Sequence, residues 1–176
     1  MFTTEEVRIA NATSRSRGAS AINKDGSIRA IVPRYIAEHI DKQSTILDYG
    51  AGKEAIHTQW LKDQGFDCTA YDFGDNCING IHNKNALSKQ YKVIFASNVL
   101  NVQSSLGMFV ETIKQIYDSL EPGGEFIANY PETPRKLDMS ANEMCNILKA
   151  LFHNNIERVG GTKSAPLFRA IKPFIN

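Results

Sequence analysis

The sequence contains only three cysteines, Cys68, Cys77 and Cys145. Their odd number and the absence of any C-x-x-C spacing argue against a disulfide framework and against a structural zinc site. The sequence also lacks a run of about 18 apolar residues, which a membrane-spanning helix needs, and it does not start with a basic and then apolar leader. We therefore expect a cytoplasmic protein without a membrane segment and without a metal site.

An excess of charge of one sign is also missing, because 20 Lys and Arg face 19 Asp and Glu, which gives a net charge of +1. This balance excludes a strong global field for nucleic acid or membranes. A local excess of four positive charges does lie between residues 13 and 34, where five basic residues face Asp25 alone. The basic residues are Arg15, Arg17, Lys24, Arg29 and Arg34. A lid over a bound carboxylate, a grip on nucleic-acid phosphates and a solvated surface all fit this segment.

The 176 residues, 42% of them hydrophobic, suit one domain with a single core. Residues 1–44 are polar and predict an N-terminal helical and basic extension or lid, with a helix around 32–40. From residue 45, short apolar runs alternate with amphipathic segments, which is typical of βαβ units. Strands are expected at 45–49, 66–71, 91–96, 125–129, 156–159 and 167–171. Helices are expected at 53–64, 106–120 and 140–152.

These elements predict an α/β fold: a Rossmann-like, mostly parallel sheet flanked by helices, within a domain of residues 45–176. The last two strands are separated by a short segment that contains Gly160, Gly161 and Pro166. Because so short a connection cannot hold a crossover helix, we expect these strands to pair antiparallel.

The segment Asp48-Tyr-Gly50-Ala-Gly52 lies between a predicted strand and a predicted helix. Glycines at this position let the backbone approach a bound nucleoside, since no Cβ stands in the way. Asp72 follows 20 residues after Gly52, at the end of the second strand, where a carboxylate can accept hydrogen bonds from both ribose hydroxyls. The same loop also satisfies the G-x-G-x-x-G/A fingerprint of NAD-binding proteins through Ala55, so a nicotinamide-dependent oxidoreductase is an alternative.

The stretch from Ile46 to Ile127 resembles the class I S-adenosylmethionine (SAM)-dependent methyltransferases. Asp48 to Gly52 is similar to the glycine-rich first motif of that family, Asp72 to its ribose acid, and 95–101 to the fourth strand and the turn after it. The resemblance implies SAM as cofactor, and the small size is similar to that of phage-encoded members. The implied cofactor-binding residues are Asp48, Gly50, Ala51, Gly52, Asp72, Phe73, Asn85, Ala86 and Asn98.

The methyl acceptor is expected beyond the ends of the fourth and fifth strands of the family's sheet, near Asn101, Asn129 and Tyr130. Asn129-Tyr-Pro131 has the wrong order and the wrong strand for the N-P-P-Y-type motif of enzymes that methylate DNA amines. No pattern places any of the four histidines as a base, so the catalytic residues stay unknown. The sequence departs from the family where Glu54, expected in the first turn of a helix, replaces a third glycine.

Three functions remain open from the sequence. The first is a methyltransferase that acts on a small molecule, a nucleic acid or a protein, and the second is a SAM-binding regulator or partner subunit that transfers no methyl group. The third is the oxidoreductase. The sequence assigns neither the acceptor atom nor the oligomeric state.

Overall fold

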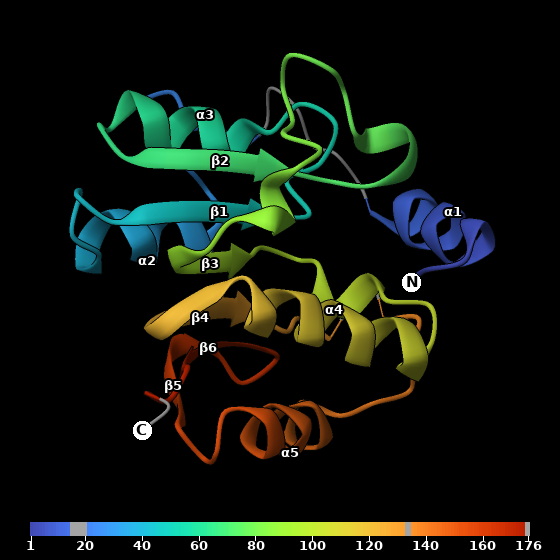
Figure 1. Cartoon of the computed structure of the whole chain (residues 1–176). Helices are drawn as coiled ribbons and strands as arrows, with labels where there is room; N and C mark the ends of the chain where they lie inside the picture. The colour runs from blue at the N-terminus through green and yellow to red at the C-terminus, as the bar shows by residue number, and fades with distance from the viewer. Residues whose placement is uncertain (15–20, 133–134, 175–176) are drawn as a thin grey trace.

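The computed structural model describes residues 1–14, 21–132 and 135–174. Its described strands form one six-stranded sheet in the order β2–β1–β3–β4–β6–β5 (Figure 1). The first four strands are parallel, and β6 pairs antiparallel with both β4 and β5. The strands are β1 (Thr45–Tyr49), β2 (Asp67–Tyr71), β3 (Tyr91–Ala96), β4 (Leu120–Asn129), β5 (Ile156–Thr162) and β6 (Ala165–Ile171). The predicted fold class, including the C-terminal antiparallel pair, is confirmed.

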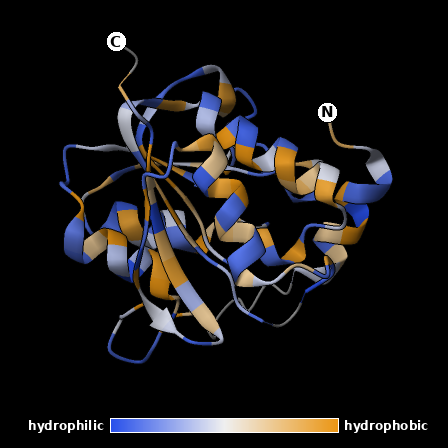
Figure 2. Cartoon of the chain, turned by 90° about the horizontal axis from the view of Figure 1, so that it is seen from below, coloured by the Kyte–Doolittle hydropathy of each residue, from blue (hydrophilic) through white to orange (hydrophobic). Residues whose placement is uncertain are grey.

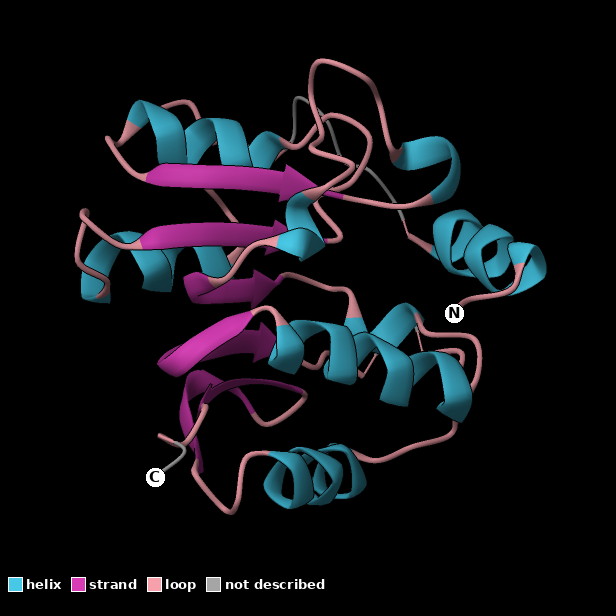
Figure 3. Cartoon of the chain, in the orientation of Figure 1, coloured by secondary structure: helices cyan, strands magenta, loops and turns pink. Residues whose placement is uncertain are grey.

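Helices cover both faces of the sheet (Figure 3). One face packs against α2 (Ile31–His39) and α3 (Ile56–Asp63), and the other against α4 (Leu106–Asp118) and α5 (Ala141–Leu151). A further helix, α1 (Thr4–Thr13), lies beyond the carboxyl ends of the strands (Figure 1). The two cores share the sheet: the side chains of Val32, Ile36 and Leu61 lie in one, and those of Phe109, Ile113 and Leu148 in the other.

The amphipathic patterns in the sequence explain why these helices form and which side they bury. Each helix in Figure 2 carries both hydrophobic and hydrophilic bands. In α4, Phe109, Ile113 and Ile116 are buried at helical spacing. The S-x-x-E spacing of Ser140 and Glu143 in the sequence predicts a capping box for α5, and the box is present: the Ser140 hydroxyl accepts from the Glu143 amide, and the Glu143 carboxylate accepts from the Ser140 amide.

Two element boundaries differ from the expectation. The helix expected at 53–64 begins at Ile56, because Ala55 takes a left-handed conformation with φ 45° that breaks the helical path. The expectation that Glu54 stands in a first helical turn is therefore wrong; the residue is exposed in the preceding loop. The strand expected at 125–129 begins at Leu120, so the Pro122-Gly-Gly124 run lies inside β4 instead of before it.

No range was predicted for helix α1 within the expected helical extension of residues 1–44, although the sequence at its start contains a capping signal. The Thr3 hydroxyl accepts from the Glu6 amide at 3.2 Å and the Glu6 carboxylate accepts from the Thr3 amide at 2.9 Å, which together form a capping box. The T-x-x-E spacing in the sequence encodes that box. Across the described ranges, no helix is long and apolar enough to cross a membrane.

Candidate functional site

A cavity of about 580 Å³ lies between α1 and the carboxyl ends of the parallel strands. Its wall includes Ala10 and Asn11 of α1, together with residues that directly follow β1, β2, β3 and β4. The crevice at the carboxyl ends of parallel strands is the usual ligand site of open α/β sheets. Seven of the residues predicted from the sequence line this cavity: Gly50, Ala51, Gly52, Asp72, Phe73, Asn98 and Asn101.

The glycine loop after β1 is tied to the end of β2. The amides of Gly50 and Ala51 both donate to the carbonyl oxygen of Tyr71, at 2.9 and 3.0 Å. Gly50 has φ 74°, and a Cβ there would lie 2.7 Å from Val99 Cγ2, so both its conformation and the space require glycine. Gly52 has φ 73°, and a Cβ there would meet no atom within 4 Å. The loop therefore leaves open space above Gly52, at the cavity wall.

Asp72 holds the other side of this loop. Its Oδ2 accepts a hydrogen bond from the Gly52 amide at 2.6 Å, and its Oδ1 accepts from the Phe73 amide at 2.8 Å. Burial raises the pKa of Asp72, while these two hydrogen bonds act in the opposite direction. Each carboxylate oxygen has further acceptor capacity, so Asp72 can still accept from two hydroxyl groups of a ligand in the cavity.

His82 also holds Gly52 in place, and no sequence pattern pointed to this residue. Its Nδ1 lies 3.0 Å from the amide nitrogen of Ile78, which can only donate, so Nδ1 accepts. The proton of the neutral ring therefore sits on Nε2, which donates to the carbonyl oxygen of Gly52 at 2.9 Å. His82 thus holds the carbonyl and Asp72 the amide of the same glycine. The short segment between β2 and β3 makes this possible, because it folds back onto the loop.

Asp48 does not reach the cavity. It is 1% exposed, and its Oδ2 accepts from the Thr58 hydroxyl of α3 at 2.8 Å. Burial raises the pKa of Asp48 to about 7, well above its ordinary value of 3.8. The structure thus shows this carboxyl joining β1 to α3.

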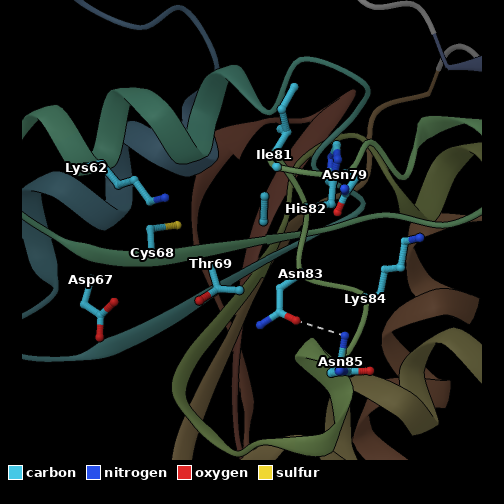
Figure 4. A pocket seen from close by; sticks show the side chains of 12 residues that line it. Lys62, Asp67, Cys68, Thr69, Asn79, Ile81, His82, Asn83, Lys84 and Asn85 are labelled. Carbon is cyan, nitrogen blue, oxygen red and sulfur yellow. Dashed lines mark hydrogen bonds between the residues drawn. The ribbon is translucent and has the colours of Figure 1, made fainter.

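The predicted residues Asn85 and Ala86 lie away from the cavity as well. Asn85 lines a groove along the outer edge of β2, where its amide donates to Asn83 Oδ1 at 2.9 Å (Figure 4). Ala86 is fully buried in the core beside α4. The aromatic wall of the cavity is Phe73, and Asn76 is its polar neighbour on the wall. Phe73 and Asn76 thus line the cavity, whereas Asn85 and Ala86 do not.

The residues after β3 and β4 form a neutral, amide-rich side. Asn98 lines the cavity, and its backbone and side chain both bond to the side chain of Asn129 at 2.8 and 2.7 Å. Asn101, which is 2% exposed, also belongs to the wall. Tyr130 is fully buried and donates its hydroxyl to the Met139 carbonyl at 2.8 Å, so Pro131 takes its place at the cavity.

Helix α1 closes the cavity through contacts at both sides. Asn11 Nδ2 donates to the Phe73 carbonyl at 3.3 Å, and the rings of Phe2 and Phe73 lie 5.2 Å apart. At the other side, the Ser105 hydroxyl donates to Glu6 Oε1 at 2.6 Å. The N-terminal part of the chain thus covers the ends of the strands.

Besides Asp72, the charged residues Arg29, Lys53 and Glu54 belong to the cavity wall. His57 also lines the cavity, and burial lowers the pKa of this imidazole to about 4, so it is neutral at physiological pH. Of the basic segment, Arg29 reaches the cavity wall and its Nε donates to Asn23 Oδ1 at 2.7 Å. Arg15 and Arg17 lie outside the described residues. Among those described, no group of three His, Cys, Asp or Glu side chains is arranged to hold a metal ion.

A mostly parallel sheet with a glycine loop after β1 and a buried carboxylate after β2 is the arrangement typical of nucleoside-binding proteins of the Rossmann-like class. Residues 21–156 match the family described as methyltransferase domain, and this chain belongs to that family. The prediction of a methyltransferase is thereby confirmed. No curated protein sequence matches the chain.

Solved structures share the fold. A magnesium protoporphyrin IX methyltransferase from Synechocystis, with bound SAM, is 11% identical with a TM-score of 0.56 over 81% of this chain and 76% of its own. A 1,6-didemethyltoxoflavin-N1-methyltransferase from Burkholderia thailandensis, with bound S-adenosylhomocysteine (SAH), is 16% identical with a TM-score of 0.57 over 81% and 76%. A TehB-like SAM-dependent methyltransferase from Corynebacterium glutamicum is 13% identical with a TM-score of 0.59 over 86% and 91%.

Proposed function

We propose that this chain binds SAM at the carboxyl ends of β1 to β3 and transfers its methyl group to a small-molecule acceptor. The observation that carries the proposal is the double anchoring of Gly52, by Asp72 at its amide and by His82 at its carbonyl, at the wall of the cavity. The solved neighbours bind SAM or SAH on the same fold. The family supplies the reaction, and the cavity supplies a place for the nucleoside.

The chain's own residues divide the work of binding. Asp72 accepts from the ribose hydroxyls, the open backbone at Gly52 admits the nucleoside, and Phe73 offers a ring face for the base. When bound, SAM supplies an electrophilic methyl group on a sulfonium. Methyl transfer of this kind depends mainly on holding the two reactants in line, so the cavity wall can contribute by orientation without a metal or a covalent intermediate.

The shape of the cavity favours a small acceptor. Its volume of about 580 Å³ has to hold the nucleoside as well as the acceptor, which leaves little room for a large acceptor group. Helix α1 packs over the strand ends through Asn11 and Glu6, which leaves a polymer little access to the groups after β3. Arg29 reaches the cavity wall, which suits a bound carboxylate better than an extended phosphate backbone.

Calorimetric titration with SAM, SAH and NAD in parallel tests the cofactor. We expect micromolar binding of SAM or SAH, about −8 kcal/mol, and no binding of NAD. Asp72→Ala is expected to abolish the binding of SAM and SAH. Asp75→Ala, which removes an exposed carboxylate three residues away, should leave this binding unchanged. Binding of NAD without SAM or SAH would favour the oxidoreductase and contradict the proposal.

A measurement of methyl transfer distinguishes an enzyme from a SAM-binding regulator. We expect purified protein to form SAH from SAM when a small-molecule fraction of a cell lysate is added. The matched additions are the nucleic-acid fraction and the protein fraction of the same lysate. SAH production with either of those, but not with small molecules, would move the acceptor to a polymer.

A further inference from the structure

The turn after β3 holds an asparagine pair whose orientation can be read without ambiguity. The backbone amide of Asn98 lies 2.8 Å from one side-chain atom of Asn129. Because a backbone N–H only donates, that atom is Oδ1, and the other is Nδ2. Asn129 Nδ2 lies 2.7 Å from the side chain of Asn98, so the atom it contacts there is the acceptor Oδ1. The remaining atom of Asn98 is Nδ2, a donor with two hydrogens.

This donor is offered to the cavity. Asn98 lines the cavity wall, and no described residue accepts a hydrogen bond from its Nδ2. Asn98 has φ 59°, a left-handed conformation that asparagine adopts more readily than most residues with a side chain. Asn129 is 6% exposed and holds the amide of Asn98 at both its backbone and its side chain. The orientation of the donor is therefore set before any ligand binds.

The neighbouring Ser97 does not supply a second donor to the cavity. Ser97 belongs to the cavity wall, but its hydroxyl oxygen is buried, so a ligand in the cavity does not reach it. The nearest buried carboxyls are bound elsewhere: Asp48 accepts from Thr58, and Asp72 follows β2, two strands away from β3 in the sheet.

We propose that Asn98 Nδ2 is a hydrogen-bond-donating subsite that takes an oxygen atom of the methyl acceptor, in a carbonyl, carboxylate or phenolate group. This inference rests on the proposed function. Asn98 has no formal charge, and the carbonyl oxygen of its side chain already accepts from Asn129 Nδ2. The subsite therefore selects a ligand oxygen that accepts a hydrogen bond over an ammonium group, which can only donate one.

The variant Asn98→Asp tests the contribution of the Asn98 Nδ2 donor alone. The aspartate keeps the shape of the side chain and keeps an oxygen that accepts from Asn129 Nδ2, but it replaces the donating NH₂ with an oxygen. The probes are benzoate and benzamide, which carry a carbonyl oxygen, and benzylamine, which is of similar size and carries an ammonium at neutral pH. Each is titrated into protein saturated with SAH, and the side-chain NH₂ signals of Asn98 and Asn129 are followed by ¹⁵N NMR.

In the unmodified protein we expect benzoate and benzamide to bind and shift the Asn98 NH₂ signal, and benzylamine to bind at least tenfold more weakly. In Asn98→Asp the order is expected to reverse. Asn98→Gly, which accepts the same backbone conformation, is expected to lose the preference without reversing it. Equal binding of the three probes, or binding of none of them, would overturn the inference.

Measurement of SAH affinity distinguishes a failure of this inference from a failure of the proposed function. We expect SAH affinity in Asn98→Asp to stay within threefold of the unmodified protein. A large loss would assign the Asn98 amide to the cofactor's own carboxylate and overturn the acceptor subsite. Failure of the unmodified protein to bind SAH would instead contradict the proposed function.

Discussion

The two sides of the cavity are built in different ways. At the ends of β1 and β2, the binding groups are already paired within the chain: Gly52 is bonded at both its amide and its carbonyl, and both oxygens of Asp72 accept. At the ends of β3 and β4, Asn98 is oriented by Asn129 but keeps a donor for a ligand. On the first side, hydrogen bonds within the chain hold the binding groups in one arrangement. On the second side, the surface is neutral, and the oriented amide donor of Asn98 favours a ligand that carries a hydrogen-bond acceptor.

Titratable groups separate the two sides as well. Burial shifts the pKa values of Asp48, Asp72 and His57, which all lie near the ends of β1 and β2, whereas the predicted residues after β3 and β4 are asparagines and a tyrosine bonded to Met139. The pH dependence of stability should therefore originate on the cofactor side. Variants that change one side at a time test how independent the two sides are.

Asp48→Asn should give the largest effect. Because the folded protein raises the pKa of Asp48 from 3.8 to about 7, it binds this proton more tightly than the unfolded chain does. Stability is therefore highest below pH 4 for this group and falls as the pH rises toward 7, by up to about 4 kcal/mol. Asparagine removes the charge and keeps an oxygen for Thr58, so we expect a higher Tm above pH 7 and a flatter profile between pH 4 and 7.

The control for this variant is Asp67→Asn, at the exposed start of β2. It should leave the difference between pH 4 and pH 7 unchanged. Thermal melts followed by circular dichroism at several pH values measure both. If Asp48→Asn melts lower than the unmodified protein at pH 8, the burial of this charge is not what limits stability there.

Gly52→Ala should follow in size. A methyl group there meets no atom of the chain, so the folded protein loses only about 1 kcal/mol from the positive φ, but the methyl occupies space that the nucleoside needs. We expect SAM affinity to fall at least 30-fold. Gly65→Ala is the matched control, since Gly65 has φ 89° and equally open surroundings away from the cavity. Calorimetry should show a similar Tm loss for both and an affinity loss for Gly52→Ala alone.

His82→Leu should have a smaller effect on the same side. It removes the donor to the Gly52 carbonyl while Asp72 still holds the amide, so we expect SAM affinity to fall about tenfold. His82→Gln retains a donor and should recover most of that loss. An equal loss in both variants would mean that His82 acts through packing and not through its hydrogen bond.

Glu6→Ala should have the smallest effect. It removes the acceptor of the Ser105 hydroxyl and one half of the capping box of α1. We expect amide hydrogens of α1 to exchange a few times faster, with no change in β1 to β4 and no change in SAH affinity. Hydrogen exchange followed by mass spectrometry measures this. Faster exchange throughout the sheet would show that α1 is part of the core and not a cover.

Sequence patterns predicted the sheet and the glycine loop because these depend on local periodicity and on positions where glycine is required. The C-terminal hairpin and the capping box at Ser140 were predicted for the same reason. The position of the Asp48 side chain could not be predicted, because it depends on whether the side chain turns toward α3 or toward the glycine loop. His82 was missed because its two bonds join residues 4 and 30 positions away in an irregular segment, where no period exists.

The acceptor side shows the same limit. Asn98 and Asn129 were selected as separate residues, for the cofactor and for the acceptor, and their spacing of 31 positions gave no reason to pair them. Only the parallel pairing of β3 with β4 brings them together. The donor that remains on Asn98 follows from that pairing.

A crystal structure of the protein with SAH tests the division of the cavity most directly. We predict that both ribose hydroxyls lie within hydrogen-bond distance of the Asp72 carboxylate, and that Asn98 Nδ2 remains free of contact with SAH, next to unfilled space. A ribose placed away from Asp72, or the SAH carboxylate bound by Asn98, would contradict the account.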